Sequence, residues 1–180
     1  DLLRAKAVLC SGLDVRLEVE KPKFKEQWCY TGGLEEYLKE RLGEGSWIPS
    51  EPFTGTLEGK RETVDWALAW NLDTEATQVN ESYVNLIPTL QGGTHVNGLR
   101  LGITDALREF CEFRNLLPRG VKLAPEDAWG GANFILAVRM EEPQFSGQMK
   151  ERLGSREIAG FVGSVVKDAF ALWLNQHPET

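Results

Sequence analysis

Two long apolar stripes at helical spacing, separated by one alternating segment, most constrain what this chain can fold into. The first stripe recurs every three or four residues from Val96 to Phe110, and the second does so from Ile158 to Leu172. Between them, residues 133–140 alternate in the way that strands do. Each stripe must be buried against another layer, so we expect a sheet with both helices packed on one face.

Further strand patterns precede the first long helix. The clearest is a strict period of two from Val64 to Leu72, where every second residue is a large apolar one. The other elements expected there are strands at 13–19, 24–30 and 83–87, short helices at 2–9 and 34–42, and a loop at 43–52. The pattern predicts one α+β domain over residues 1–180, with a mostly antiparallel sheet of three or four strands and no internal repeat.

Charge and hydropathy limit the classes of function. The net charge of −7 disfavours a general nucleic-acid-binding surface. Residues 100–122 differ, with five basic and three acidic side chains, so a path for nucleic acid stays open beside the alternative of a solvated helix face. No run approaches the roughly 18 apolar residues of a membrane span, and we expect no signal peptide. These features predict a cytoplasmic protein without a membrane partner.

Residues of the types that catalyse reactions or bind metals are few. Cys10, Cys29 and Cys111 have no metal-like spacing, and reduced packing residues are what we expect of them. The two histidines, His95 and His177, fit neither a zinc pattern nor a catalytic triad. We therefore predict no metal site and no catalytic residue in this chain.

A glycine-containing segment, Gln-Gly-Gly-Thr-His at 91–95, stands directly before the first long helix. Glycines there can present backbone N–H groups to an anion. Their spacing fits neither the Walker pattern nor the dinucleotide fingerprint. A tight turn with Thr94 as the helix cap is the interpretation that we favour.

Residues 143–150 (PQFSGQMK) form a loop between the strand at 133–140 and the second long helix, for which Ser155 is a candidate N-cap. Gly147 and the lack of bulky side chains around it predict a loop that is free to move. Lys150 would then be a charge on a flexible stem, suited to contacting a phosphate that arrives from outside. By composition alone, the commoner alternative is a solvated lysine without a role.

Several segments resemble the B subunits of bacterial type IIA DNA topoisomerases, the gyrase B family. The segments are YVNLIPTLQGGTHVNGLR at 83–100, EFCEFRNLLPRGVKL at 109–123, PQFSGQMKERL at 143–153 and VVKDAFALWLNQ at 165–176. The resemblance extends over essentially the whole chain. The run LPRGVK at 117–122 resembles topoisomerase IV more than gyrase, and the equivalent gyrase domain is the alternative within the family.

This resemblance implies that the chain is the transducer domain, the second domain of the ATP-gated half of the subunit. The chain begins without methionine and within a helical pattern, so we expect a piece of a longer protein whose ATP-binding domain comes before it. The family fold includes a left-handed βαβ crossover, against the usual hand. The resemblance also implies that Lys150 reaches the γ-phosphate of ATP in the neighbouring domain, assisted by Gln148. Met149 stands where the family has threonine.

The function so implied is ATP coupling in a type II topoisomerase, a DNA-binding isomerase of chromosome segregation. The transducer would relay nucleotide state to the DNA gate for strand passage, decatenation and relaxation. Cofactors of the full subunit would be ATP and Mg²⁺, with none bound to this fragment. Its partners would be the N-terminal ATPase domain, a second B subunit, DNA, and the A subunit of topoisomerase IV.

The ATPase motifs of the family, namely the magnesium-binding asparagine, the glutamate base and the glycine-rich lid, are missing from this sequence. We therefore expect an isolated chain that is monomeric and inactive. Two functions outside the family are alternatives to this one. They are a non-catalytic binding or scaffold domain, and an autonomous enzyme that uses Cys111 or His95.

Overall fold

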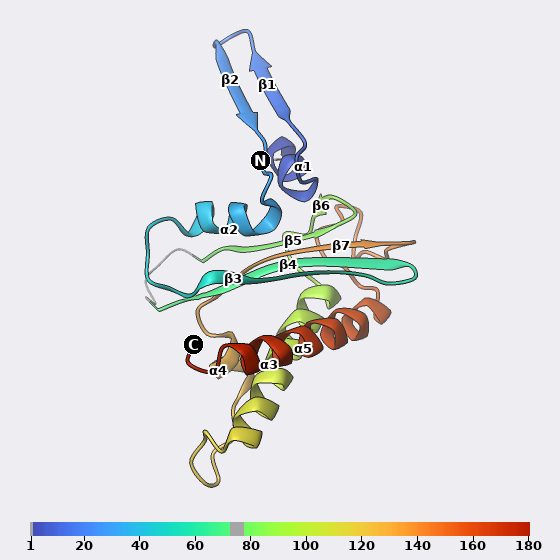
Figure 1. The fold of residues 1–180 in the computed structure, drawn as a ribbon. Helices are drawn as coiled ribbons and strands as arrows, with labels where there is room; N and C mark the ends of the chain where they lie inside the picture. The colour runs from blue at the N-terminus through green and yellow to red at the C-terminus, as the bar shows by residue number, and fades with distance from the viewer. Residues whose placement is uncertain (1, 73–77) are drawn as a thin grey trace.

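The computed structural model describes residues 2–72 and 78–180. Within these residues the chain has an α+β fold, with two sheets and five helices (Figure 1). The elements are α1 (Leu2–Leu9), β1 (Val15–Val19), β2 (Phe24–Trp28), α2 (Gly33–Leu42), β3 (Trp47–Glu58), β4 (Glu62–Asn71), β5 (Asn80–Val84), β6 (Ile87–Pro88), α3 (Thr94–Arg114), α4 (Pro125–Trp129), β7 (Ala132–Met140) and α5 (Glu157–Gln176).

The main sheet has the strand order β3-β4-β7-β5-β6, five strands instead of the three or four predicted. All neighbours are antiparallel except β5 and β7, which are parallel. The chain passes from β5 to β7 through α3 and α4, a βαβ connection whose left-handed sense stays a prediction. The mostly antiparallel sheet is confirmed.

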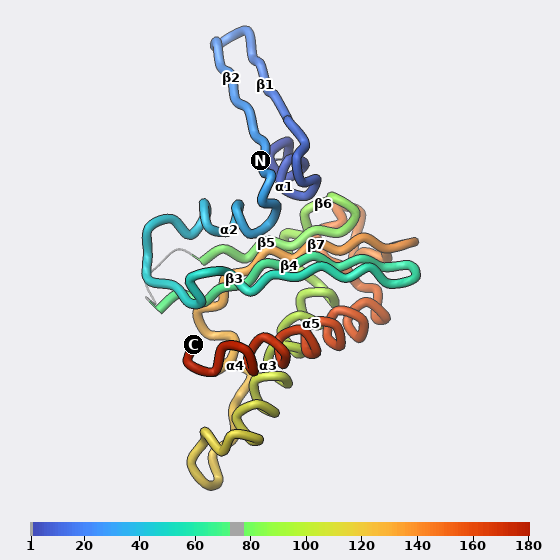
Figure 2. The backbone as a smooth tube through the Cα atoms, in the orientation of Figure 1, coloured from blue at the N-terminus to red at the C-terminus, as the bar shows by residue number. Residues whose placement is uncertain are grey.

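The sheet separates two hydrophobic layers. The long helices α3 and α5 cover one face, as predicted, while α1 and α2 lie on the opposite side (Figures 1 and 2). In β7, Phe134 and Leu136 belong to the core under α3 and α5, whereas Ile135 belongs to the core beside α1 and α2. Alternate residues of a strand point to opposite faces, so β7 is buried on both sides. The sequence patterns did not predict this second layer.

The two long helices approach each other closely because glycines lie where they meet. A Cβ atom on Gly98 would stand 2.5 Å from the carbonyl oxygen of Ala159, and one on Gly102 would stand 2.5 Å from that of Gly163. The two backbones are therefore in direct contact. This packing joins α3 and α5 in one closely packed layer.

The first two strands form a separate antiparallel hairpin that projects away from the main sheet (Figure 1). Its register places Val15 opposite Trp28 and Val19 opposite Phe24, which confirms the two predicted strands. A two-stranded hairpin has little stability of its own in water. Whether another part of the protein packs on this hairpin therefore bears on where the domain begins.

Four local predictions need correction. The strand predicted at 83–87 is interrupted, because β5 ends at Val84 and a turn at residues 85–86 precedes β6. The loop predicted at 43–52 is shorter, because β3 already begins at Trp47; an edge strand tolerates prolines such as Pro49. Thr94 is the first residue of α3 and not its cap, which is Gly93. Ser155 does not cap α5, whose N-cap is Arg156, because its hydroxyl accepts a hydrogen bond from the loop instead.

Candidate functional site

Lys150 lies at the tip of a short hairpin that connects β7 to α5. The arms are joined by a bridge between Phe145 and Leu153 and by two hydrogen bonds. The N–H of Ser146 donates to the carbonyl of Arg152 at 2.9 Å, and the N–H of Gly154 donates to the carbonyl of residue 144 at 2.7 Å. The backbone pairing therefore fixes the arms and leaves only the tip, residues 147–150, unpaired.

The side chains at this tip face solvent. Gln148, Met149 and Lys150 are exposed, with Met149 at 80%. The Nζ atom of Lys150 lies 5.9 Å from the centre of the Phe145 ring, a weak cation–π contact within the hairpin. Among the described residues, neither Gln148 nor Lys150 has a hydrogen-bonded or ion-paired partner. Both can therefore bind a group that comes from outside.

The returning arm of the hairpin is attached to the segment at the start of α3. The N–H of Leu153 donates to the carbonyl of Gly92 at 3.0 Å, and the N–H of Thr94 donates to the carbonyl of Leu153 at 3.1 Å. A Cβ atom on Gly93 would stand 2.4 Å from that same carbonyl oxygen, so only glycine allows the contact. The glycines at 92 and 93 thus form a tight turn that anchors the Lys150 hairpin.

The sequence alone does not show that these two segments are in contact. The pair of glycines before the helix is the one sequence signal of their contact, and it does not name the partner. Leu153 pairs with Gly93, 60 positions away, through a single bridge. A single bridge leaves no periodic pattern in the sequence, so the contact could not be predicted.

The residues considered for an autonomous enzyme are buried. His95 is fully buried, and its Nε2 atom lies 3.1 Å from the hydroxyl of Thr89. Burial lowers the pKa of His95 from 6.5 to about 4, so the ring is neutral near pH 7. Burial also raises the pKa of Cys111, which disfavours the reactive thiolate. Neither group is accessible to a substrate.

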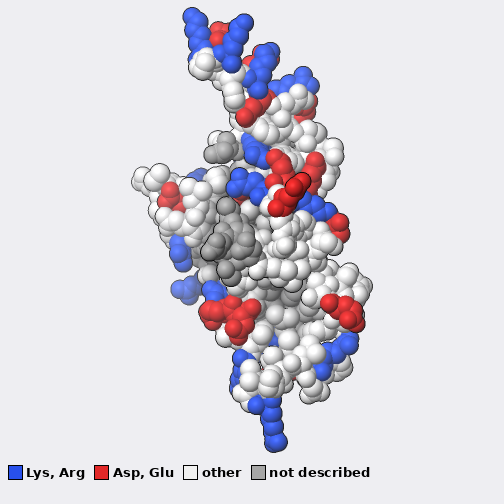
Figure 3. Space-filling model, turned by 90° about the vertical axis from the view of Figure 1, so that its left-hand side faces the viewer, with Lys and Arg blue, Asp and Glu red and all other residues white. Residues whose placement is uncertain are grey.

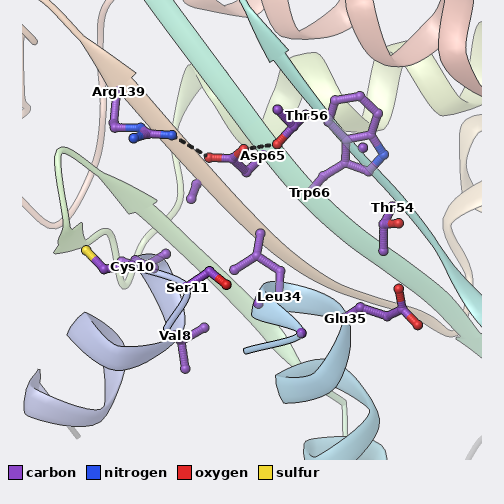
Figure 4. A pocket seen from close by; sticks show the side chains of 15 residues that line it. Val8, Cys10, Ser11, Leu34, Glu35, Thr54, Thr56, Asp65, Trp66 and Arg139 are labelled. Atoms are coloured by element: carbon purple, nitrogen blue, oxygen red, sulfur yellow. Dashed lines mark hydrogen bonds and ion pairs between the residues drawn. The ribbon is translucent and has the colours of Figure 1, made fainter. Parts of the chain in front are cut away.

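Apart from the hairpin, a hollow lies between α1, α2 and the sheet (Figure 4). Its charged side chains have partners: Arg139 donates to Asp65 at 3.1 Å, and the neutral hydroxyl of Thr56 also donates to Asp65. Glu35 is likewise paired, with Lys39. No free charge is left there to select a ligand. Within residues 2–72 and 78–180, no group of three or more potential metal ligands occurs, and no helix could span a membrane.

Basic side chains appear at both ends of the molecule in Figure 3, at the β1–β2 hairpin and near the loop that follows α3. Of the basic residues between positions 100 and 122, Arg100 pairs with Glu126 and Arg108 with Asp105. Arg119 and Lys122 are exposed in the loop and form no ion pair with a described residue. The basic residues of α3 thus belong to a solvated face of mixed charge. Those of the loop after α3 are free to contact a negatively charged partner.

Comparison with known proteins identifies relatives along the whole chain. The family model for DNA gyrase B matches residues 33–180. The B subunit of topoisomerase 4 from Pseudomonas aeruginosa is 61% identical over 178 residues, and that from Escherichia coli is 55% identical over 176 residues. These matches cover 99% and 98% of the chain but 28% of each relative. The chain thus spans under a third of the length of these relatives.

Solved structures agree with this result. The topoisomerase IV ATP binding domain of Francisella tularensis, in complex with a small-molecule inhibitor, matches with a TM-score of 0.83 and 37% identity. The match covers 99% of this chain and 47% of that one. The 43K ATPase domain of Thermus thermophilus gyrase B shares the fold, with a TM-score of 0.82 at 24% identity over 99% of this chain and 48% of that chain. The chain therefore belongs to the DNA gyrase B family, which comprises the B subunits of the type II DNA topoisomerases gyrase and topoisomerase IV.

Proposed function

We propose that the chain is the transducer domain of a topoisomerase IV B subunit, which couples the nucleotide state of a neighbouring ATPase domain to the DNA gate. The observation that carries the proposal is the exposed Lys150, with Gln148 beside it, on a hairpin anchored to the first turn of α3. Identities of 61% and 55% to topoisomerase 4 B subunits favour that enzyme over gyrase. The chain matches about half of each solved ATPase-region structure, which leaves room for a separate nucleotide-binding unit.

The geometry suits a sensor of the γ-phosphate. When ATP is bound, its γ-phosphate supplies a negative charge that is lost from the site after hydrolysis and release. Lys150 would donate charge-assisted hydrogen bonds to this group and stabilise the charge of the phosphoryl group during transfer. Gln148 would add a neutral donor. A displacement of the tip would act on the start of α3 through Leu153, and α3 would carry α5 with it.

The cofactors fit this division of roles. Lys150 offers a cation for a phosphate, but the described residues offer no carboxylate cluster that could hold Mg²⁺. We infer that the neighbouring domain holds ATP and Mg²⁺, and that the isolated chain hydrolyses no ATP. In the full enzyme, its partners would be a second B subunit, DNA, and the A subunit.

The hairpin of β1 and β2 bears on the extent of the domain. One domain over residues 1–180 stays a prediction, and two observations favour a boundary near Gly33. The family match begins at residue 33, and β1 and β2 form a sheet apart from the main one. We propose that residues 1–32 complete the ATPase unit, and that the transducer proper begins at α2.

The test is Lys150→Ala in the full-length B subunit in complex with its A subunit. Loss of a hydrogen bond to a charged group should weaken binding of a non-hydrolysable ATP analogue about tenfold to a hundredfold, and should leave ADP binding unchanged. ATP hydrolysis should fall as well. Gln148→Ala should have a smaller effect, about twofold to tenfold, because its amide donor is neutral and only the phosphate is charged.

Lys60→Ala is the matched control, since Lys60 is an exposed lysine in the turn between β3 and β4. It should leave both nucleotide affinities unchanged. ATP hydrolysis at the wild-type rate by Lys150→Ala would show that the assigned role is wrong.

A further inference from the structure

A strained two-residue turn connects β5 to β6. Val84 pairs with Ile87, so Asn85 and Leu86 are the whole turn, and their φ angles are 49° and 66°. Two positive φ values match the hairpin turn that usually takes Asn-Gly. Leucine at the second position is unusual, because its side chain disfavours this backbone conformation. Such a conformation persists where the surrounding structure holds it.

The side chain of Asn85 joins the turn to the root of the Lys150 hairpin. The pairing of β5 with β7 ends at Val84 and Val138. Beyond that point, Nδ2 of Asn85 donates to the carbonyl of Met140 at 2.9 Å, and Oδ1 accepts from the N–H of Met140 at 2.9 Å. The side-chain amide of Asn85 thus takes the place of one more pair of backbone hydrogen bonds between the strands. Because Met140 is the last residue of β7, Asn85 fixes the point from which the hairpin departs.

The other side of the turn is held by α1. The ammonium of Lys6 donates to the carbonyl of Leu86 at 2.7 Å, in a partly buried contact. Its neighbour Arg4 anchors the same helix to α2 through Glu40, at 2.6 Å. α1 lies outside the residues matched by the family model, whereas the turn lies inside them. The Lys6 contact therefore crosses the boundary proposed near residue 33.

We propose that the Asn85–Leu86 turn transmits the position of α1 to the Lys150 hairpin, with Lys6 and Asn85 as positioning residues for Lys150. This inference rests on the proposed function of Lys150. The chain on both sides of the hairpin tip is hydrogen-bonded to the segment 85–94. Met140, which precedes the hairpin, bonds to Asn85, and Leu153, on the returning arm, bonds to residues 92–94. A shift of α1 would move this segment through Lys6. The paired hydrogen bonds of Asn85 would then carry the shift to Met140.

The first test is Lys6→Met in the full-length B subunit with its A subunit. Methionine keeps an apolar stem and removes the donor to Leu86. We expect the affinity for a non-hydrolysable ATP analogue to fall about two- to thirtyfold, the range of such couplings, with ADP affinity unchanged. Lys6→Arg, which keeps a donor, should recover most of the affinity. Lys60→Met is the control and should behave as wild type.

A double variant separates positioning from general damage. If Lys6 acts through Lys150, Lys6→Met combined with Lys150→Ala should bind the analogue no more weakly than Lys150→Ala alone. Additive losses, or an equal loss of ADP and analogue affinity in Lys6→Met, would overturn the inference.

Asn85→Asp tests the turn itself, since it keeps the acceptor and replaces the donor to Met140. It should show the same selective loss of analogue affinity. If it does not fold, the Lys6 variants still decide. A defective Lys150→Ala together with wild-type behaviour of Lys6→Met would overturn this inference alone. Unchanged analogue affinity in Lys150→Ala would overturn the proposed function and, with it, this inference.

Discussion

At the scale of single residues, the burial of His95 makes the fold sensitive to acid. Burial lowers its pKa from 6.5 to about 4, because the protonated ring would lose its hydration. Between these values the unfolded chain binds a proton that the folded chain does not. The stabilising contribution is therefore complete above pH 6.5 and is lost as the pH falls toward 4, by about 2 to 3 kcal/mol at pH 4.5.

Urea unfolding at pH 7 and pH 4.5 measures this loss. In His95→Gln, the difference in unfolding free energy between the two pH values should shrink by that amount. His177→Gln is the matched control, because it removes the other histidine, which is exposed. A His95→Gln protein with the wild-type pH dependence would show that another group is responsible.

The same scale shows what the sequence can predict about the site. Lys150 and Gln148 are proposed from the motif that contains them, and the structure shows that both are exposed at the tip of the hairpin. The anchoring role of Gly93 could not be named, because it depends on the carbonyl of Leu153 standing where a Cβ would be. Thr94 and Ser155 were plausible caps by residue type. A side-chain hydroxyl can also hydrogen-bond to backbone groups elsewhere in the chain, and that of Ser155 accepts from the N–H of residue 144.

At the scale of elements, the contact between α3 and α5 makes a direct prediction. Gly102→Ala would place a methyl group 2.5 Å from the carbonyl oxygen of Gly163, and backbone cannot rotate away as a side chain can. We expect a loss of about 1–3 kcal/mol in unfolding free energy from overpacking. Gly160→Ala, on an exposed face of α5 with open space, should instead stabilise by about 0.5–1 kcal/mol. Denaturant unfolding of the two variants measures the contrast, and a stabilised Gly102→Ala protein would contradict the close packing.

Element prediction succeeded where periodicity extends over many residues. Both long helices and the strand at 64–72 carry three or more repeats of their pattern, and each is found close to the predicted bounds. The start of β3 was missed because its prolines suggest a loop, although an edge strand can hold them. The five-residue helix α4 is too short for a repeat to show.

At the scale of the whole molecule, the fold class could be predicted but the strand order could not. A layer of two amphipathic helices requires a sheet, and this requirement gives the α+β class. The central place of β7, between β4 and β5, depends on pairing between segments more than 50 residues apart. Such pairing leaves no mark on local periodicity. The two short helices α1 and α2 were predicted, but their place on the second face was not, since small residues such as Ala67 and Ala69 gave that face no apolar stripe.

The projecting hairpin supports a last prediction, which tests the boundary near Gly33. Val19 and Phe24 share one face of the hairpin and are 37% and 44% exposed. A two-stranded sheet without a covering layer opens at low free-energy cost, whereas β4 and β7 lie in the core. In the 180-residue chain, amides of β1 and β2 should exchange with solvent far faster than those of β4.

In the full-length B subunit, the same hairpin amides should become strongly protected, because we propose that residues 1–32 complete the ATPase unit. The exposed loop at 115–122 is the internal control and should exchange rapidly in both proteins. Hydrogen exchange read by mass spectrometry resolves the three segments in one experiment. Protection equal to that of β4 in the 180-residue chain would mean that the hairpin needs no neighbour. Rapid exchange in the full-length protein would mean that no neighbour covers it. Either result would contradict the proposal that residues 1–32 complete the ATPase unit.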